Sequence, residues 1–507
     1  MLLNHRSTAP KGSLMFAALL GGLFFAICFY VMQVGHLHED AYILYQYSRS
    51  FSRGLGISFD ITNGPAEGAT DFLWMAILGL AHRIFTGYVP IGVISAFLNS
   101  LGVAYVASQI FIIRKCVDLN GCVLCLLLLL SGGAAASIGG FATVAYGSFY
   151  VATILAFWRN KLTHGLVLAA LLALFRPDGF FLGLPTIIAF LIVQRGELDL
   201  SQATRKVLLF YVLPLVLYFA WRYSYFGLLL PLPLLVKQRT DYLFEGLRPN
   251  LESIKLYIPI IAGIFILRNR LDKRLATLAL SGSLTLYAVL LFAHQSQNVG
   301  SRFQFPLHIV IILLAASAFP SKNRIAYISS VLILIAVNTA SGGFRSNINY
   351  LTNNDYINSF PQILSQKMAV DSIAITEAGR FPYWSNSKSV IDLVGLNSKQ
   401  VVLNGPLAEL KRVSPDLIFV HHASRFVFPE GLKGVNVDYF EFDPRNVKIY
   451  QYEGSNPVAL APAAALKDAI DRSLVGIAVK YGDRDWSYSH VYFLSKSVEL
   501  NLSLIHI

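Results

Sequence analysis

Charged residues are scarce in this chain, and their scarcity argues against an ordinary soluble enzyme. Only 14% of the 507 residues are Asp, Glu, Lys or Arg, whereas 55% are hydrophobic and the mean hydropathy is +0.55. The 35 Phe and 25 Tyr residues are typical of membrane-spanning helices with aromatic belts at both interfaces. The composition therefore predicts an integral membrane protein.

Cysteine is also rare, and several well-known sequence motifs are missing. Cys28, Cys116, Cys122 and Cys125 all lie in or beside apolar runs, which predicts neither a disulfide framework nor a zinc site. We find no P-loop and no G-x-G-x-x-G, H-E-x-x-H or G-x-S-x-G motif. Nucleotide-driven transport and soluble-cofactor chemistry have no support in the sequence.

Basic residues nevertheless outnumber acidic ones, 41 to 29, for a formal net charge of +12. In a membrane protein such an excess is typical of cytoplasmic loops, where anionic lipids are the natural partners. The chain has no basic stripe on a soluble helix and no nucleic-acid motif. We therefore expect membrane lipids, and not nucleic acid, among its partners.

Eleven apolar runs approach the length of about 20 residues that a membrane-spanning helix needs. A signal peptide is the alternative interpretation of the first run, but the run is long and no A-x-A cleavage site follows it. With Arg6 and Lys11 on the cytoplasmic side, this run is an anchor that places the next segment on the outer face. The runs are 13–34, 72–86, 89–113, 121–137, 141–158, 164–194, 207–225, 255–269, 275–294, 305–320 and 324–341.

Basic residues at 114–115 and at 159–161 do not both fit this topology. One short segment between 72 and 165 is therefore expected to be re-entrant or to lie along the interface. The proposed fold is a multi-span α-helical membrane domain over residues 1–342, with about eleven transmembrane helices.

From about residue 343 the pattern changes to short strand-like runs separated by polar turns and helical patterns. These features predict a soluble extracytoplasmic α/β domain over residues 343–507. The expected strands are 371–376, 389–394, 416–421 and 447–451, and the expected helices are 404–413 and 464–475.

Three of the acids in the polar segment 35–71, which follows the first apolar run, lie near its two ends and are candidates for function. Glu39 and Asp40 stand where that run should surface, and Glu67 precedes the next run. Acids at a membrane boundary are candidates for chemistry. A structural interpretation stays open, because Glu39 and Asp40 also suit the start of a helix that begins near Ala41.

Basic and aromatic candidates accompany these acids. The helix expected after Asp40 carries Tyr42 and Arg49 and should end at Gly54.

Arg176-Pro177-Asp178-Gly179 interrupts an apolar run and should break its helix. Arg176 is then either a structural partner of Asp178 or a ligand-binding residue. Arg302 directly precedes another apolar helix and suits either a lipid phosphate or an interfacial anchor.

Short motifs follow one another between residues 39 and 397. In the membrane region they are Glu39-Asp40-Ala41-Tyr42-Ile43, Gly54-x-Gly56, Glu67-Gly68-x-Thr70-x-Phe72-Leu73-Trp74, Arg176-Pro177-Asp178-Gly179, Trp221-Arg222 with Phe226-Gly227, Pro231 and Lys237, and Arg302-Phe303 with Pro306. In the C-terminal region they are Thr376-Glu377-Ala378-Gly379 and Ile391-Asp392-Leu393-Val394-Gly395-Leu396-Asn397. Together they resemble the motifs of bacterial GT-C glycosyltransferases, closest to the branch of mycobacterial terminal arabinofuranosyltransferases.

The sequence departs from the pattern of that family at several positions. Glu39 stands where the family has Asp, and Ala142 stands where it has an acid. Leu228 and Leu232 replace an acid and an asparagine.

The resemblance implies transfer of a sugar, for example arabinofuranose, from a polyprenyl-phosphate donor at the bacterial plasma membrane. The acceptor would be a cell-envelope glycan, lipid or protein on the extracytoplasmic face. Asp40 is then the expected general base, and Glu39 orients the acceptor or shares a divalent cation with it.

Cationic groups would stabilise the leaving phosphate in such a reaction. Arg302 and Lys237 are the first candidates and Arg176 the next, while Glu67 fixes the loop or the sugar. Tyr42 and Arg49 are expected to contribute to substrate binding.

Two other classes of function are compatible with the same residues. A transporter of lipid-linked sugars predicts charged residues within several spans and internal repeats, neither of which the sequence contains. A non-catalytic partner of a glycan-assembly complex is the other alternative, because Ala142 replaces an acid.

Overall fold

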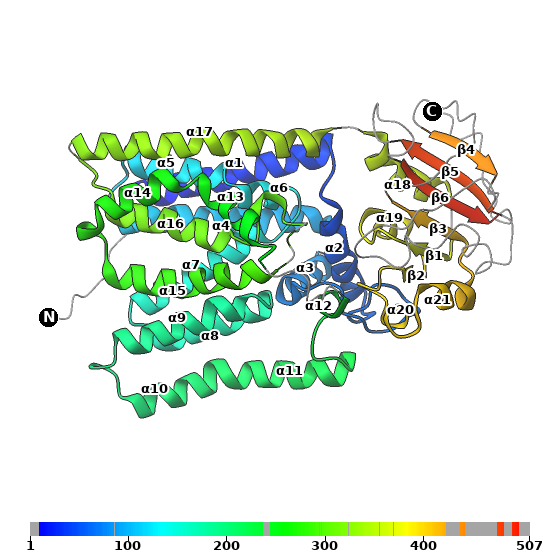
Figure 1. Ribbon diagram of the computed structural model, residues 1–507, viewed down its shortest axis with the longest axis horizontal. Helices are drawn as coiled ribbons and strands as arrows, with labels where there is room; N and C mark the ends of the chain where they lie inside the picture. Colours follow the sequence, from blue (N-terminus) through cyan, green and yellow to red (C-terminus); the bar gives the residue numbers. More distant parts are fainter. Residues whose placement is uncertain are drawn as a thin grey trace.

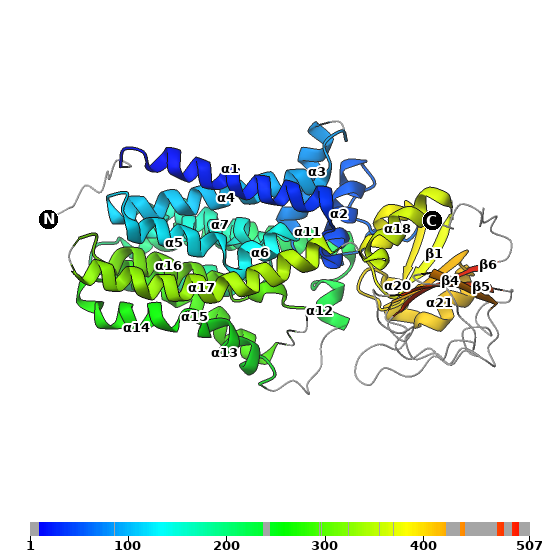
Figure 2. The same cartoon turned by 90° about the horizontal axis from the view of Figure 1, so that it is seen from above.

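The computed structural model describes residues 10–421, apart from 86, 237–243, 294, 296, 323, 354 and 369, and the strands at 437–441, 474–480 and 489–495. The helices up to α17 form an elongated bundle, and a smaller region with a β-sheet lies at one end of it (Figures 1 and 2). We call these the bundle and the C-terminal region.

Five stretches of the described chain are helical, apolar and long enough to cross a bilayer. They comprise α1 (Ser13–Val34), α4 (Ile91–Arg114), the continuous α10, η1 and α11 (Leu200–Val207, Leu208–Val212 and Leu213–Phe226), α15 with η3 (Lys273–Val289 and Leu290–Phe292), and α17 (Arg324–Thr352) running on to α18 (Tyr356–Lys367). Two bent helix pairs raise the number to seven if each pair is one span. These pairs are α5–α6 (Leu119–Leu129 and Gly132–Ile138, 49°) and α13–α14 (Leu247–Lys255 and Ile258–Ile266, 69°).

The remaining apolar helices of the bundle are shorter than a span. They are α3 (Phe72–Ile84), α7 (Thr143–Trp158), α8 (Leu162–Phe175), α9 (Gly179–Val193) and α16 (Phe305–Ala318). Each of the eleven predicted apolar runs contains helix, so the mostly helical architecture with candidate membrane spans is confirmed. The number of eleven crossings stays a prediction.

The predicted break in the run 164–194 is confirmed, because α8 ends at Phe175 and α9 begins at Gly179. Pro177 cannot donate a backbone hydrogen bond and therefore does not continue a helix. The residues between the two helices are thus free to present their side chains at the end of the bundle.

Helix α2 (Glu39–Ser52) lies across the end of the bundle, next to the C-terminal region (Figures 1 and 2). Both Glu39 and Asp40 fall in its first turn, where the helix dipole favours acids. The helix stops just before Gly54, which has a φ of +79°. The helix and its end agree with the sequence-based prediction.

The C-terminal region contains a six-stranded sheet in the order β2-β1-β3-β6-β5-β4. Strands β1 (Ser372–Ile375), β2 (Ser389–Asp392) and β3 (Leu417–Val420) are parallel, whereas β4 (Val437–Glu441), β5 (Leu474–Lys480) and β6 (Ser489–Ser495) join antiparallel. Three expected strands are thereby confirmed, and the fourth, 447–451, lies outside the described residues.

Helices of the C-terminal region are short. In the described part of this region, α18 (Tyr356–Lys367) is followed by the shorter helices α19 (Arg380–Ser385), α20 (Lys399–Asn404) and α21 (Pro406–Val413), so the helix expected at 404–413 is present. The helix expected at 464–475 lies mostly outside the described residues, and β5 begins at Leu474. Helix α17 continues to Thr352, ten residues past the boundary placed at 342.

Hydrogen bonds fix the C-terminal region to the segment 35–71. The Asp60 carboxylate accepts from the backbone N–H of Val390 at 2.6 Å. The Glu39 carboxylate accepts from the N–H groups of Gly379 and Arg380. The start of α19 and the start of β2 are therefore both tied to the same polar segment.

Gly379→Ala should loosen this attachment. A Cβ at residue 379 would lie 2.1 Å from the backbone oxygen of Glu39, a clash that neither backbone can relieve without moving. We expect a loss of about 1–3 kcal/mol in stability, the usual effect of overpacking. The measurement is thermal unfolding of the purified protein, and Gly342→Ala is the control because nothing lies within 4 Å of a Cβ there. Equal melting temperatures for the two variants would contradict the tight contact.

Candidate active site

Asp40 and Arg302 meet at the end of the bundle. Arg302 Nη2 lies 3.4 Å from Asp40 Oδ2, although 262 residues separate the two in the chain. The Asp40 side chain keeps 37% of its surface exposed, whereas Arg302 keeps 11%. The pair therefore combines an accessible carboxylate with a largely buried cation.

The Arg302 guanidinium is held by rings and is not saturated with hydrogen bonds. Its Cζ lies 3.7 Å from the ring centroid of Phe141 and 5.1 Å from that of Phe303. Within the described part of the chain, its buried Nη1 has no hydrogen-bond partner. Burial lowers the pKa of Arg302, and the nearby Asp40 opposes this shift. A buried cation with a free donor is suited to an anionic ligand.

Arg176 also lies beside the Phe303 ring, but the carboxylate of Asp178 already neutralises its charge. Its Nε and Nη2 bond the two carboxylate oxygens of Asp178 at 3.0 and 3.1 Å. Asp71 Oδ2 lies 4.0 Å from Arg176 Nη1, and burial raises the pKa of Asp71. The Cζ of Arg176 lies 5.4 Å from the Phe303 centroid. The sequence left two interpretations of Arg176 open, a structural partner of Asp178 or a ligand-binding residue. The structure shows the pair with Asp178.

A network of buried amides fixes the loop that carries Arg302. Gln304 Nε2 donates to Asn250 Oδ1 at 2.7 Å and to Gln295 Oε1 at 2.6 Å. Asn298 Nδ2 donates to Gln304 Oε1 at 2.7 Å, and Asn298 Oδ1 accepts from the N–H of Phe303. The network thus ties both flanks of Arg302 to α13.

Close backbone packing supports the same loop. It includes the short helix η4 (Val299–Ser301), in which Gly300 has a φ of +60°. A Cβ on Gly300 would lie 2.3 Å from the backbone oxygen of Gly132 in α6. Only glycine permits both this conformation and this approach.

Gln304→Ala should destabilise the protein and weaken anion binding at Arg302. The substitution removes the three hydrogen bonds that Gln304 makes with Asn250, Gln295 and Asn298, each worth about 0.5–1.5 kcal/mol. The two measurements are thermal unfolding and binding of a polyprenyl phosphate, the class of donor lipid that the sequence resemblance implies. The control is Gln297→Ala, an exposed residue of the same loop. Identical behaviour of the two variants would show that the network does not position Arg302.

Glu39 faces away from the Asp40–Arg302 pair. In addition to the N–H groups of Gly379 and Arg380, its carboxylate lies 3.6 Å from the Arg380 Nε. Arg380 in turn donates to the backbone oxygen of Leu37 at 3.2 Å. Glu39 therefore attaches the C-terminal region to α2. Within the described residues, no group of three or more His, Cys, Asp or Glu side chains is arranged to hold a metal ion.

Tyr42 and Arg49 lie in the contact between α2 and α19. The Tyr42 ring is buried, 5.3 Å from the centroid of Tyr383 and 6.1 Å from that of Trp384. The Cζ of Arg49 lies 4.5 Å from the Tyr383 centroid. The two residues predicted to bind substrate are therefore brought together, but by packing around Tyr383.

Glu67 forms a second, separate ion pair with Arg222. Arg222 Nη1 donates to Glu67 Oε1 at 3.1 Å, and both side chains are almost completely buried. Burial raises the pKa of Glu67 to about 7, although Arg222 opposes the shift. The Glu67 backbone oxygen also accepts from the N–H of Leu232, the first residue of α12 (Leu232–Val236). These contacts favour a role of Glu67 in fixing the loop.

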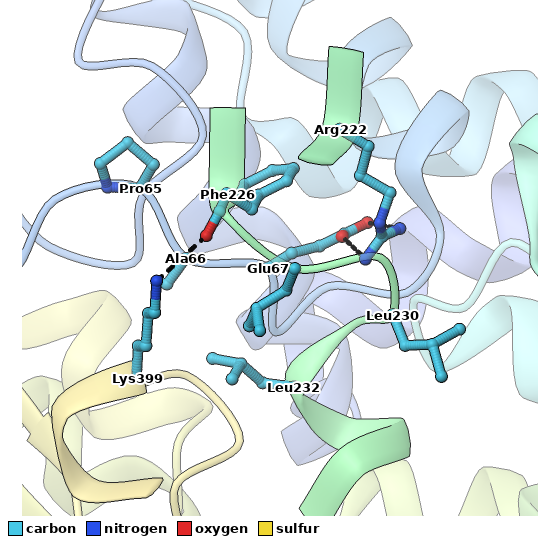
Figure 3. Close-up of a pocket in the computed structure, with 9 residues that line it drawn as sticks. Pro65, Ala66, Glu67, Arg222, Phe226, Leu230, Leu232 and Lys399 are labelled. Carbon is cyan, nitrogen blue, oxygen red and sulfur yellow. Dashed lines mark hydrogen bonds and ion pairs between the residues drawn. The ribbon is translucent and has the colours of Figure 1, made fainter. Parts of the chain in front are cut away.

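A pocket opens beside this pair (Figure 3). Lys399 from α20 reaches toward it and donates to the backbone oxygen of Phe226 at 3.3 Å. The pocket is lined by Pro65, Ala66, Glu67, Arg222, Phe226, Leu228, Leu230, Leu232 and Lys399. It shares no lining residue with the Asp40–Arg302 pair. Lys237, the other predicted phosphate ligand, lies outside the described residues, one position after α12.

Sequence reasoning did not assign roles to three residues of the site. Asp71 lies within the motif that begins at Glu67, and Arg380 directly follows the motif that ends at Gly379. Arg222 stands in its own motif, but its partner is 155 residues away. Motif membership marked these positions, whereas their pairing depends on the tertiary structure.

Comparison with known proteins adds a likeness of fold. A family model described as a domain of unknown function, DUF8728, matches residues 351–465. The crystal structure of ArnT from Cupriavidus metallidurans bound to undecaprenyl phosphate is similar over 80% of this chain and 93% of that chain, with a TM-score of 0.57 and 11% identity. The chain shares the fold of ArnT.

Two further structures are similar to the chain. The apo state of the same ArnT covers 81% of this chain and 94% of that chain, with a TM-score of 0.56 and 11% identity. Arabinofuranosyltransferase AftD from Mycobacteria has a TM-score of 0.48 and 10% identity, over 96% of this chain and 40% of that chain. No curated protein sequence matches the chain. The likeness to ArnT agrees with the GT-C-like architecture expected from the sequence.

Proposed function

We propose that the protein is an integral-membrane glycosyltransferase that moves a sugar from a polyprenyl-phosphate donor to an acceptor hydroxyl group. The observation that carries this proposal is the Asp40–Arg302 pair, in which an accessible carboxylate adjoins a cation whose Nη1 has no hydrogen-bond partner among the described residues. A base and a phosphate-binding group are the two functions that such a transfer needs side by side. The fold shared with ArnT bound to undecaprenyl phosphate supports the choice of donor.

The reaction assigns one task to each side chain. The acceptor hydroxyl oxygen attacks the anomeric carbon of the donor while Asp40 takes its proton. The bond between the anomeric carbon and the phosphate oxygen breaks, and polyprenyl phosphate leaves with the bonding electrons. Arg302 stabilises the negative charge that grows on this phosphate. Because Asp178 already neutralises Arg176, we assign the phosphate to Arg302.

The proposed orientation in the membrane and the proposed sugar of the donor are based on features of the sequence. Basic residues of the N-terminal segment favour a cytoplasmic N-terminus, and the eleven crossings expected from the sequence support our proposal that the active site and the C-terminal region lie on the extracytoplasmic face of the plasma membrane. The motif resemblance favours arabinofuranose as the sugar. The acceptor is a glycan, lipid or protein of the cell envelope.

The test is incubation of the purified protein with a panel of radiolabelled polyprenyl-phosphate sugars, including the arabinofuranosyl derivative. Octyl glycosides serve as acceptors. Release of polyprenyl phosphate and appearance of label in the acceptor are the expected results. Movement of intact donor across vesicles would instead identify a transporter, and binding without cleavage would identify a non-catalytic partner. Either result would overturn the proposal.

A further inference from the structure

A stack of rings runs from α17 to the guanidinium of Arg302. Tyr350 of α17 stacks on His38 with a centroid distance of 5.3 Å and an interplanar angle of 19°. His38 in turn stacks on Phe141 at 5.5 Å and 25°. The Cζ of Arg302 lies 3.7 Å from the Phe141 centroid, which is direct contact between the guanidinium and the ring. Phe141 is therefore the member of the stack that contacts the cation.

The backbone fixes Phe141 on both sides of its ring. Its N–H donates to the oxygen of Ala136 at 3.2 Å, and its carbonyl oxygen accepts from Asn99 Nδ2 at 3.1 Å. The preceding Gly140 has a φ of +102°, a conformation that favours glycine. Because these contacts hold the chain around it, the half-buried ring is a fixed surface for the guanidinium.

His38 is fixed by the bundle as well. Its Nε2 bonds Asn347 Oδ1 at 3.1 Å, and its backbone N–H donates to the oxygen of Gly139 at 2.9 Å. A Cβ on Gly139 would lie 2.1 Å from Cδ2 of the His38 ring, so this ring packs directly against the turn that precedes Phe141. Burial lowers the pKa of His38 to about 4. The ring is thus neutral at physiological pH and carries no charge that would repel Arg302.

Contact through a ring leaves the hydrogen-bond donors of the guanidinium available. These donors point outward in the plane of the group, whereas a cation–π contact uses its face. Arg302 Nη2 lies 3.4 Å from Asp40, and its buried Nη1 has no hydrogen-bond partner among the described residues. A carboxylate in place of the ring would neutralise the charge, as Asp178 does for Arg176. The ring therefore holds the cation without occupying the donor that a phosphate needs.

We propose that Phe141 is a positioning residue for phosphate binding, whose ring, supported by His38, holds the Arg302 guanidinium with Nη1 open to the phosphate of the lipid donor. Phe141 acts through Arg302 and does not touch the phosphate itself. An aliphatic side chain of similar size lacks the negative π-face that attracts a cation, so an aromatic ring is required at residue 141. This inference rests on the proposed function and adds a residue that controls how tightly the phosphate is bound.

The test is binding of radiolabelled undecaprenyl phosphate to the purified full-length protein and its variants. Phe141→Leu removes the ring but keeps an apolar side chain, and we expect the dissociation constant to rise by about 2- to 30-fold, the range for a cation–π contact. Phe141→Tyr and Phe141→Trp keep an aromatic ring, and the better of the two should bind close to the wild type. Phe25→Leu is the matched control, because Phe25 is also half-buried and its ring contacts those of Phe29 and Phe97. It should leave the dissociation constant unchanged.

A double variant separates positioning from a general structural role. Once Arg302→Gln has removed the cation, the ring has nothing left to position, so Phe141→Leu combined with Arg302→Gln should bind no more weakly than Arg302→Gln alone. The melting temperature is determined for each variant, and Phe141→Met replaces Phe141→Leu if the latter does not fold. Additive losses in the double variant would overturn the proposal. Equal binding by Phe141→Leu and the wild type, or no recovery in either aromatic variant, would also overturn it.

Failure of this inference can be distinguished from failure of the proposed function. A wild type that binds undecaprenyl phosphate but cleaves no donor in the panel would overturn the proposed function, and the variants would still decide the role of Phe141 in phosphate binding. A wild type that does not bind undecaprenyl phosphate would overturn both.

Discussion

Asp40→Asn should reduce sugar transfer by about 10²- to 10⁴-fold, the contribution of a general base. An amide has nearly the same shape as the carboxylate but does not take up the proton of the acceptor hydroxyl. The side chain is 37% exposed and pairs with Arg302 at the relatively long distance of 3.4 Å, so the protein should remain folded. The measurement is the initial rate of transfer from the polyprenyl-phosphate sugar, with the melting temperature determined on the same sample.

Asp371→Asn serves as the control for this substitution, because it removes an exposed carboxylate of the C-terminal region. Its rate should equal that of the wild type. Full activity of Asp40→Asn would remove Asp40 from the mechanism.

Arg302→Gln should lower kcat by about 10²- to 10³-fold, as expected when a group that stabilises charge in the transition state is removed. It should also weaken binding of undecaprenyl phosphate, because the buried Nη1 has no other partner within the described residues. Arg302→Lys should restore part of the rate, since lysine keeps the charge but loses the planar fork of donors. Transfer rates and phosphate binding are both measured.

Arg345→Gln is the matched control, because Arg345 is exposed on α17. It should leave both quantities unchanged. Unaltered phosphate binding in Arg302→Gln would contradict the assignment of the phosphate to Arg302. The next candidates would then be Arg222 and Lys399, which line the pocket beside Glu67.

Much of the local structure could be predicted from the sequence. The helix after Asp40, its end before Gly54 and the break at Pro177 all follow from local preferences, and all three are present. Strands β1, β2 and β3 were also expected from short apolar runs. These features depend on neighbours in the chain, which a sequence displays directly.

The pairing of charges could not be predicted in the same way. Asp40 meets Arg302 across 262 residues, and Glu67 meets Arg222 across 155. Such pairs form only when distant helices are packed, and no local periodicity encodes them. The motifs marked the positions of these residues, and the structure adds which residues they pair with.

The acids Glu39 and Asp40 illustrate the difference. As neighbours in the sequence they were natural candidates for a shared cation, but on α2 their carboxylates turn to different partners. Glu39 attaches the C-terminal region, and Asp40 stays accessible. Likewise Arg176 has the charge for a phosphate but is already paired with Asp178.

The most direct test of the division between Asp40 and Arg302 is an experimental structure of the protein with bound undecaprenyl phosphate. We predict that the phosphate lies against the Arg302 guanidinium, within hydrogen-bond distance of Nη1, and next to the Asp40 carboxylate. A phosphate bound instead between Arg222 and Lys399, or beside Arg176 with the Asp178 pair broken, would contradict the account.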